Sequence, residues 1–301
     1  MPELPEVEVV RAGLEPVVTG ATAASVTVFD ERSLRRHDGP SEDFIDRLTG
    51  RVFQTPQRRG KFMWLPLGDA ANSSGHSEAL VAHLGMSGQV LLRDRSTDDR
   101  LTRIRIDLDH PEHGALRLNF VDQRIFGSMS IDSMLPTVDQ PAHAVPSQVA
   151  HIARDPLDPF FDDAKFLRAL KAKRTTVKRA LLDQTLVSGI GNIYADEALW
   201  AARVHYDQPT ESLSRAKAVT LLAEVRAVFA KALAEGGTSF DAQYLNVNGE
   251  SGYFAHSLNV YGQQGKECPR CGREVVREKF MNRGSHFCAY CQRVRTGSQT
   301  V

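Results

Sequence analysis

The sequence predicts an α+β protein, with a strand-rich N-terminal half, a helical segment and a C-terminal metal-binding hairpin. Three observations support this fold class. Short strand-like runs separated by glycines and polar residues fill residues 1–135. From about Asp162 the apolar residues recur with the spacing of helices. All four cysteines lie between residues 268 and 291.

Five runs in the N-terminal half have the β-branched and alternating character of strands. Glycines and polar residues interrupt them at intervals typical of a β-sandwich or barrel. These runs cover residues 24–29, 61–65, 89–92, 104–108 and 115–120.

One N-terminal segment predicts a helix instead. Val7, Val10, Leu14 and Val18 recur near helical spacing within residues 6–18. The segment is therefore expected to be helical, unlike the strand-like runs around it.

The C-terminal half begins after a proline-rich stretch. Residues 136–159 contain five prolines and predict a linker. Residues 213–235 predict a long amphipathic helix, capped by Ser212 or Ser214 and ended by Gly236-Gly237. We expect four parts: a sheet domain over 1–135, a linker over 136–159, a helical domain over 160–260 and a hairpin over 261–301.

Composition and charge restrict the class of protein. The 301 residues are 42% hydrophobic and 25% charged, as in soluble globular proteins, and the formal net charge is zero. There is no stretch of 18 apolar residues and no signal peptide, so we expect a cytoplasmic protein without membrane contact. Basic residues cluster at 58–61, 171–179 and 266–301, which predicts a local phosphate-binding surface.

The cysteines form two pairs, Cys268-Pro269-Arg270-Cys271 and Cys288-Ala289-Tyr290-Cys291. This C-x2-C…C-x2-C spacing is typical of a zinc ribbon, in which four thiolates close a tetrahedron around one structural Zn²⁺. Two disulfides are the alternative, which the lack of a secretory signal disfavours. The residues between the pairs predict a hairpin, with strands over 272–279 and 285–287 and Arg283 in the turn.

A second candidate site follows two glycines. Gly189 and Gly191 predict a turn, after which a helix begins near Asn192. The N–H groups at the start of a helix attract anions, and Asn192, Tyr194 and Lys178 could add donors and charge to a phosphate. A helical hairpin whose glycines serve only packing is the alternative.

The start of the chain carries a third candidate site. Once Met1 is removed, Pro2 has a free secondary amine, and an α-amino group has a pKa of about 7.7–8.0. Such an amine can attack an aldehyde or sugar acetal carbon to form an iminium. Glu3 and Glu6 place carboxylates nearby for proton transfer. An ordinary exposed terminus is the alternative.

Taken in order, these motifs resemble the formamidopyrimidine-DNA glycosylase family of oxidised-base repair enzymes. The resemblance covers essentially the whole chain. It rests on residues 2–6 (Pro-Glu-Leu-Pro-Glu), 59–61 (Arg-Gly-Lys), 83–88 (His-Leu-Gly-Met-Ser-Gly), 122–127 (Asp-Gln-Arg-Ile-Phe-Gly), 189–195 (Gly-Ile-Gly-Asn-Ile-Tyr-Ala) and the cysteine hairpin. It implies an N-terminal β-sandwich joined to a helix–two-turn–helix domain with a zinc finger.

The resemblance also implies a reaction and its residues. Pro2 is implied to attack C1′ of the damaged nucleotide, and Glu3 to assist sugar opening and proton transfer. Lys61 is implied as the proton donor in β-elimination, and Arg283 as the donor and phosphate clamp in δ-elimination. The implied substrate is double-stranded DNA with oxidised purines, such as 8-oxoguanine and formamidopyrimidines, or with abasic sites. We expect a monomer.

The remaining DNA contacts are implied in the same way. Met86, Arg124 and Phe126 match the family's wedge, which fills the space that an everted base leaves. Lys178, Asn192 and Tyr194 match its phosphate-binding positions, and we assign Arg174 of the basic cluster to DNA as well. The loop 237–254 is a candidate lid over the everted base.

Two positions depart from the family pattern. Ile125 stands where some members have a second arginine, and Leu101 stands where many have a histidine that contacts DNA. Both departures concern DNA affinity more than chemistry. Two alternatives stay open: an endonuclease VIII-like glycosylase for oxidised pyrimidines, and a zinc-ribbon protein that binds damage without cutting.

Overall fold

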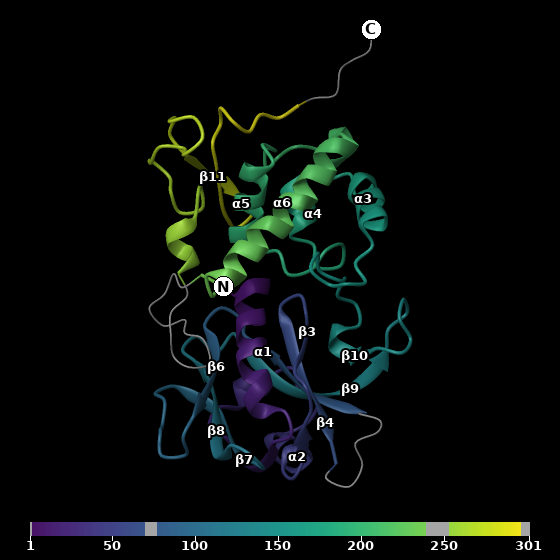
Figure 1. The fold of residues 1–301 in the computed structure, drawn as a ribbon, viewed down its shortest axis with the longest axis vertical. Coiled ribbons are helices and arrows are strands. Elements are labelled where there is room, and N and C mark those ends of the chain that lie inside the picture. The colour runs from purple at the N-terminus through teal and green to yellow at the C-terminus, as the bar shows by residue number, and fades with distance from the viewer. Residues whose placement is uncertain (1, 70–76, 239–252, 296–301) are drawn as a thin grey trace. The chain divides into compact units, whose positions relative to one another are not determined.

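The computed structural model describes residues 2–69, 77–238 and 253–295 (Figure 1). Their contacts divide the chain into two compact units. The first comprises the described residues of Met1–His151 and Gly236–Gly252, and the second those of Ile152–Glu235 and Tyr253–Val301. Within these ranges, no helix has both the length and the apolar character needed to span a membrane.

The first unit is built on a ten-stranded antiparallel sheet. The strand order is β10-β9-β5-β4-β2-β1-β7-β8-β6, with β3 paired to β4 off this path. The strands are β1 (Thr22–Val28), β2 (Val52–Phe53), β3 (Gln57–Arg59), β4 (Phe62–Gly68), β5 (Glu78–His83), β6 (Gly88–Arg93), β7 (Thr102–His110), β8 (Gly114–Asp122), β9 (Ser128–Pro136) and β10 (Ala144–Pro146).

Both arms of this sheet contribute to one hydrophobic core. Leu65 of β4 and Leu80 of β5 share it with Ile106 of β7 and Phe120 of β8, which lie at the other end of the strand order. The sheet therefore folds over on itself, in agreement with the predicted sandwich. Each such apolar side chain contributes about 1.5–3 kcal/mol when it is fully buried.

Helix α1 (Leu4–Val18) completes the core of the first unit. The four valines and leucines that predicted its apolar face (Val7, Val10, Leu14 and Val18) are all buried. A second helix, α2 (Ser41–Leu48), adds Phe44 and Leu48, and a 3₁₀ turn, η1 (Glu31–Leu34), adds Leu34.

The five predicted strand runs all lie within or overlap observed strands, and other elements were not predicted. Strands β2, β3, β5, β9 and β10 and helix α2 have no counterpart among the predictions. Residues 136–159, predicted as a linker, contain β10 and the 3₁₀ turn η2 (Ser147–Val149), and β10 pairs with β9. The division between the two units falls inside this stretch, after His151.

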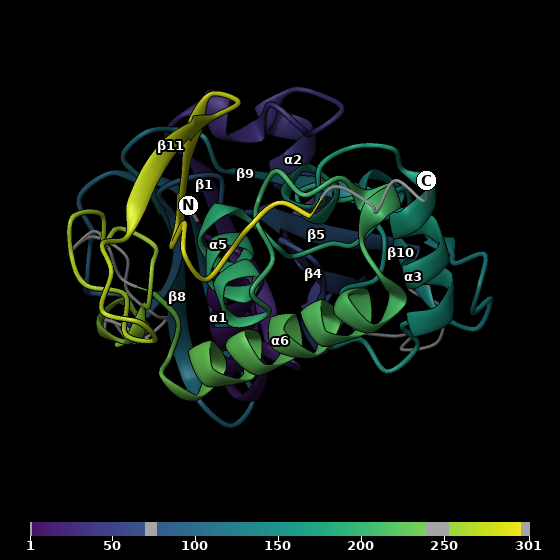
Figure 2. The same cartoon turned by 90° about the horizontal axis from the view of Figure 1, so that it is seen from above.

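The second unit is helical, and its longest helix is α6 (Arg215–Ala234), which packs against α5 (Asn192–Ala201), as Figure 2 shows. As predicted, Ser214 caps α6, and Gly236 and Gly237 follow it with left-handed backbones. The other helices are α3 (Asp163–Ala172), α4 (Val177–Leu181), and the 3₁₀ turns η3 (Thr210–Ser212) and η4 (Phe254–Ser257).

A two-stranded hairpin completes the second unit. Strands β11 (Val276–Phe280) and β12 (Arg283–Phe287) pair antiparallel, with Phe280 opposite Arg283. The loop between them is only Met281 and Asn282, and Met281 has a left-handed φ of 54°. Arg283 is therefore the first residue of the returning strand, one position beyond the tip.

Candidate functional site

The N-terminal residues of α1 are held by one carboxylate. Pro2 and Glu3 are buried, and the Glu3 N–H donates to Oε2 of Glu6 at 2.8 Å. Oε1 of Glu6 accepts from the backbone N–H and the hydroxyl of Thr238, at 2.8 and 2.9 Å. Gly237 passes close to the same carboxylate with a φ of +81°. Glu6 therefore fixes both Glu3 and the segment that follows α6, rather than standing ready for proton transfer.

The turn that carries Lys61 is tied to α1. Gly60 and Lys61 connect β3 to β4, and Gly60 adopts a φ of 58°. Arg58 donates from Nη1 to the carbonyl of Gly60 at 3.1 Å and from Nε to Glu8 of α1 at 2.8 Å. Burial raises the pKa of Glu8, but hydrogen bonds from Arg11 and Arg58 outweigh it and hold this pKa below its ordinary value. The charged Glu8–Arg58 pair thus links the Lys61 turn to the helix that follows Pro2.

The three predicted wedge residues lie on two adjoining loops. Met86 and Phe126 are unusually exposed for apolar side chains, at 40% and 50%, and Arg124 is exposed as well. Nη1 of Arg124 lies 4.0 Å from Sδ of Met86. Exposed apolar groups beside a cation are what insertion into a base stack needs.

Asp122 connects these two loops through hydrogen bonds. It is fully buried and accepts hydrogen bonds from the Ser87 hydroxyl at 2.6 Å, the Arg124 N–H at 3.1 Å and the Gly127 N–H at 2.7 Å. The loops also touch directly, because a Cβ on Gly85 would lie 2.3 Å from the Phe126 carbonyl group. The two loops of the predicted wedge are therefore held together by the Asp122 carboxylate and by direct backbone contact.

His83 supports the first of these loops. Its Nδ1 accepts from the Gly85 N–H at 3.2 Å, and its ring packs on Phe62 with centroids 4.7 Å apart. Burial, together with the charges of Arg36, Lys61 and Arg35, lowers its pKa to about 4. The ring is therefore neutral near pH 7 and supports the loop that carries Met86.

Both residues that depart from the family pattern have left-handed backbones. Leu101 has a φ of 69° and Ile125 a φ of 55°, a region that bulky and β-branched residues seldom occupy. Arg35 donates to the carbonyls of Ile125 and Phe126, which helps hold this conformation.

In the second unit, Lys178 of α4 is completely buried. Its Nζ donates to Oδ1 of Asp196 and to the Ser285 hydroxyl, both at 2.6 Å, and to the Gly284 carbonyl at 3.3 Å. The other Asp196 oxygen accepts from the His286 N–H at 2.8 Å. Lys178 therefore binds the start of β12, and a direct phosphate contact would require it to leave these partners.

Asn192 and Tyr194 of α5 are also buried. Nδ2 of Asn192 donates to the Gly284 carbonyl at 3.0 Å. The Tyr194 ring is 1% exposed and stacks on Phe254, with centroids 5.6 Å apart. Both side chains therefore support neighbouring segments from inside the second unit.

Arg174 and Arg283 are the exposed members of the predicted DNA-binding set in this unit. Arg174 follows α3 with a φ of 48°, and Arg283 precedes Gly284 on β12. The carbonyl of Gly284 accepts from both Lys178 and Asn192. Helices α4 and α5 thus hold Gly284, which follows Arg283 on β12.

The four cysteines are arranged for one metal ion. Their sulfurs all lie within 4.8 Å of one another, which suits a tetrahedral Cys₄ zinc site. Trp200 Nε1 donates to Sγ of Cys268 at 3.4 Å, a second-sphere hydrogen bond to a thiolate. Cys268, Cys271, Cys288 and Cys291 would hold one structural Zn²⁺, which fixes the ends of the hairpin that bears Arg283.

Sequence reasoning missed Asp122 and Asp196 as organising residues. Each is a buried carboxylate that accepts several hydrogen bonds from a functional segment. Nothing in the local sequence marks their burial. Glu6 did carry a signal, because a glutamate at the third position of a helix typically closes a capping box.

Three family models match the chain in order. The N-terminal domain of formamidopyrimidine-DNA glycosylase matches residues 1–129, its H2TH domain matches residues 152–243, and the zinc finger found in FPG and IleRS matches residues 265–294.

Whole-length relatives agree with these matches. A formamidopyrimidine-DNA glycosylase of Leifsonia xyli is 63% identical over 98% of this chain and 100% of its own. Two solved structures of Lactococcus lactis Fpg each cover 97% of this chain and 99% of theirs at 30% identity. One is a variant bound to Fapy-dG DNA, with a TM-score of 0.81, and the other is bound to oxidised-pyrimidine DNA, with a TM-score of 0.80. The chain belongs to the formamidopyrimidine-DNA glycosylase family.

Proposed function

We propose that this protein is a bifunctional DNA glycosylase and AP lyase that excises oxidised purines from double-stranded DNA in base excision repair. The observation that carries the proposal is the fixed position of the buried Pro2-Glu3 end, held through Glu6 at the start of α1. A nucleophile gains most from such positioning when the reacting atoms are already aligned.

The reaction begins at the nitrogen of Pro2. Its lone pair attacks C1′ of the damaged nucleotide, the bond from C1′ to the base breaks, and the base leaves with a proton. Glu3 assists the opening of the sugar ring and the proton transfers, which yields an iminium between Pro2 and C1′. The iminium withdraws electrons from the sugar and makes the C2′ proton acidic. Loss of this proton forms a C2′–C3′ double bond as the bond from C3′ to the phosphate oxygen breaks, so the 3′ phosphate leaves by β-elimination.

Cationic side chains serve the elimination steps. Lys61, on the turn held by Arg58, donates a proton in β-elimination. Arg283, on the hairpin beside Lys178 and Asn192, clamps phosphate and assists δ-elimination at the 5′ side. Met86, Arg124 and Phe126 fill the gap in the duplex, and Arg174 contacts phosphate. Lys178, Asn192 and Tyr194 act on DNA through the residues that they position.

Borohydride trapping tests the nucleophile and the substrate together. The mature protein is incubated with a duplex that contains one 8-oxoguanine, and sodium borohydride reduces the iminium to a stable amine. We expect a covalent adduct whose mass and fragmentation place the sugar on Pro2, and no adduct or strand cutting from Pro2→Gly. The variant Pro16→Ala, changed later in α1, controls for helix disturbance and should still be trapped. An adduct on a lysine would refute the role of Pro2.

A second substrate class has one specific observation in its favour. The Lactococcus lactis protein has been solved with oxidised-pyrimidine DNA as well as with Fapy-dG DNA. We expect purine lesions to be preferred. A panel of duplexes with 8-oxoguanine, formamidopyrimidine or thymine glycol ranks the lesions by kcat/KM, and a higher value for thymine glycol would favour the pyrimidine-acting alternative.

We further propose that the enzyme works as a monomer in the cytoplasm. Light scattering of the free protein and of its complex with a lesion duplex measures the mass directly. One protein per duplex supports the monomer, and a two-to-one complex contradicts it.

A further inference from the structure

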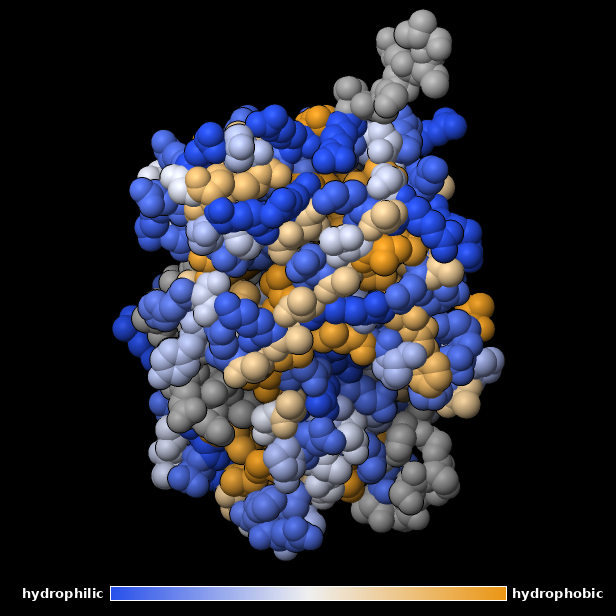
Figure 3. Space-filling model, turned by 45° about the horizontal axis from the view of Figure 1, so that its top comes forward, coloured by the Kyte–Doolittle hydropathy of each residue, from blue (hydrophilic) through white to orange (hydrophobic). Residues whose placement is uncertain are grey.

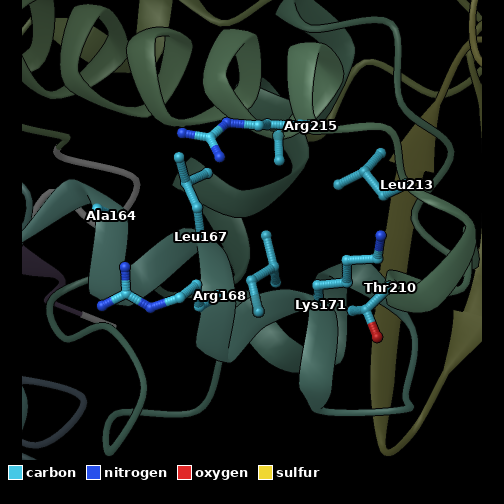
Figure 4. Close-up of a pocket in the computed structure, with 9 residues that line it drawn as sticks. Ala164, Leu167, Arg168, Lys171, Thr210, Leu213 and Arg215 are labelled. Atoms are coloured by element: carbon cyan, nitrogen blue, oxygen red, sulfur yellow. The ribbon is translucent and has the colours of Figure 1, made fainter.

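A groove lies between α3, η3 and the beginning of α6 in the second unit (Figure 4). Its volume is about 230 Å³, and its apolar lining includes Leu170 and Leu213, which are 1% and 7% exposed. Small-molecule pockets usually measure about 300–1,000 Å³, so this groove suits one or two side chains better than a cofactor. It contains Lys171 of the basic cluster 171–179, but none of the individual residues proposed above to contact DNA.

Three cations line this apolar groove: Arg168 and Lys171 of α3, and Arg215 of α6. Within the described parts of the chain, none of them forms an ion pair or stacks on an aromatic ring. The acid nearest in sequence on α3, Asp163, is bound by Arg226 through two hydrogen bonds. The positive charge of the groove is therefore not neutralised from within the fold.

A second group of cations continues this surface. A smaller hollow on the other side of Leu213 contains Arg203, Lys217, Arg293 and Arg295. Burial lowers the pKa of Lys217, and the charges of Arg295, Arg203 and Arg270 lower it further. Figure 3 shows that apolar patches lie among strongly hydrophilic residues on the face that the view presents.

We propose that the groove between α3 and α6 binds an acidic segment of a partner protein that carries a bulky apolar side chain. The apolar side chain enters between Leu170 and Leu213, and the carboxylates pair with Arg168, Lys171 and Arg215. Arginine clusters recognise acidic motifs in this manner, and a buried apolar anchor adds most of the affinity. Nucleic acid fits the groove less well, because a phosphate backbone would leave the apolar lining uncovered.

Fluorescence anisotropy with three labelled peptides tests this proposal on the full-length, zinc-loaded protein. The first peptide is Asp-Glu-Asp-Leu-Glu-Trp, the second replaces its acids by amides (Asn-Gln-Asn-Leu-Gln-Trp), and the third removes its apolar groups (Asp-Glu-Asp-Ala-Glu-Ala). We expect the first to bind with a Kd of roughly 1–100 µM, typical of a transient contact. The other two should bind at least about tenfold more weakly.

Two variants locate the binding. Arg168→Glu/Arg215→Glu should weaken the first peptide at least about tenfold, because it reverses two facing charges. Ala164→Trp fills the groove without a charge change and should also block the peptide. The matched control is Lys165→Glu/Lys231→Glu, which makes two charge reversals of the same size on the same two helices outside the groove. All variants should cut a lesion duplex like the wild type.

Three results would overturn the proposal. The first is equal binding of the three peptides, and the second is an equal loss of peptide affinity in the matched control. The third is that Arg168→Glu/Arg215→Glu weakens the binding of undamaged duplex as much as it weakens the binding of the peptide. The last result would assign the groove to nucleic acid.

Discussion

Lys178 Nζ lies 2.6 Å from Asp196 Oδ1, and both side chains are shielded from solvent. Around this pair, the hydroxyl of Ser285 and the N–H of His286 complete a network that fixes the first residues of β12. The pair therefore connects α4 and α5 to the strand that begins with Arg283. The Lys178–Asp196 pair thus holds in place the strand that carries Arg283, a candidate catalytic residue.

Removal of the Lys178 ammonium group should lower the stability of the protein. Breaking a buried ion pair leaves the other charge uncompensated, at a cost of about 3–5 kcal/mol, so Lys178→Met should lower the free energy of unfolding by that amount. Denaturant titration measures it, with the exposed Lys165→Met as control. Lys178→Met/Asp196→Leu should recover part of the loss because no lone charge remains. A loss below about 1 kcal/mol would mean that the pair behaves like an exposed one.

Gly85 should tolerate no side chain. Its φ is +63°, and a Cβ would lie 2.3 Å from the backbone of Phe126, so Gly85→Ala must separate the two wedge loops. We expect a loss of more than about 3 kcal/mol in stability and a large fall in lesion excision. Gly114→Ala is a matched control, because Gly114 has a φ of +71° and nothing within 4 Å of the new Cβ. It should cost about 1 kcal/mol. Equal losses of stability in the two variants would mean that the left-handed backbone, and not the contact with Phe126, determines the cost of the substitution.

Asp122→Asn should loosen the wedge without changing its exposed residues. The amide nitrogen would face an N–H donor, so at least one of the three hydrogen bonds to Ser87, Arg124 and Gly127 is lost, at about 1–3 kcal/mol. We expect kcat/KM for an 8-oxoguanine duplex to fall about tenfold. Fluorescence of 2-aminopurine beside the lesion should report less base eversion. The exposed Asp94→Asn should leave both measurements unchanged, and an equal effect there would rule out a specific role for Asp122.

His83 should make the protein less stable in acid. Its pKa of about 4 in the folded state lies below its value of 6.5 in the unfolded chain, so the unfolded state binds more protons between these values. Stability is therefore full above pH 6.5 and falls as the pH drops toward 4, by up to about 3 kcal/mol. In denaturant titrations from pH 4 to 7, the free energy of unfolding of the variant His83→Gln should depend less on pH than that of the wild type. An unchanged slope would contradict a buried neutral ring.

Zinc removal should affect the second unit first, because all four cysteines belong to it. We expect one zinc ion per chain, and a chelator with a thiol-reactive mercurial should release it together with the strand-cutting activity. Trp200, which donates to Cys268, should change its fluorescence during release, and Trp200→Phe should remove that change. Release of metal without loss of cutting would contradict the structural role of the site.

The sequence could predict features that depend on local pattern. The apolar spacing of Val7, Val10 and Leu14 specified α1, and Ser214 with Gly236 specified the ends of α6. The cysteine spacing likewise predicted the hairpin and its metal. The short strand β10 was not foreseen, because it pairs with β9 across prolines that suggested a linker.

Burial of polar side chains could not be predicted in this way. Lys178 and Tyr194 resemble surface donors in the sequence, but each finds its partners in segments far along the chain, at Ser285 and Phe254. Local sequence does not record such long-range pairing. The exposed Met86 and Phe126 show the reverse case, since apolar residues usually belong to the core and only the family resemblance indicated otherwise.

The hydrogen bond between Glu6 and Thr238 joins residues 232 positions apart. During synthesis, residues 1–151 emerge from the ribosome long before residue 238 does, and N-terminal units generally fold first. The nascent sheet unit therefore forms without the two hydrogen bonds that Thr238 donates to Glu6. Glu6 gains its hydrogen bonds from Thr238 only after α6 has been translated, so a chain that ends before residue 238 would lack one of the contacts that hold the start of α1.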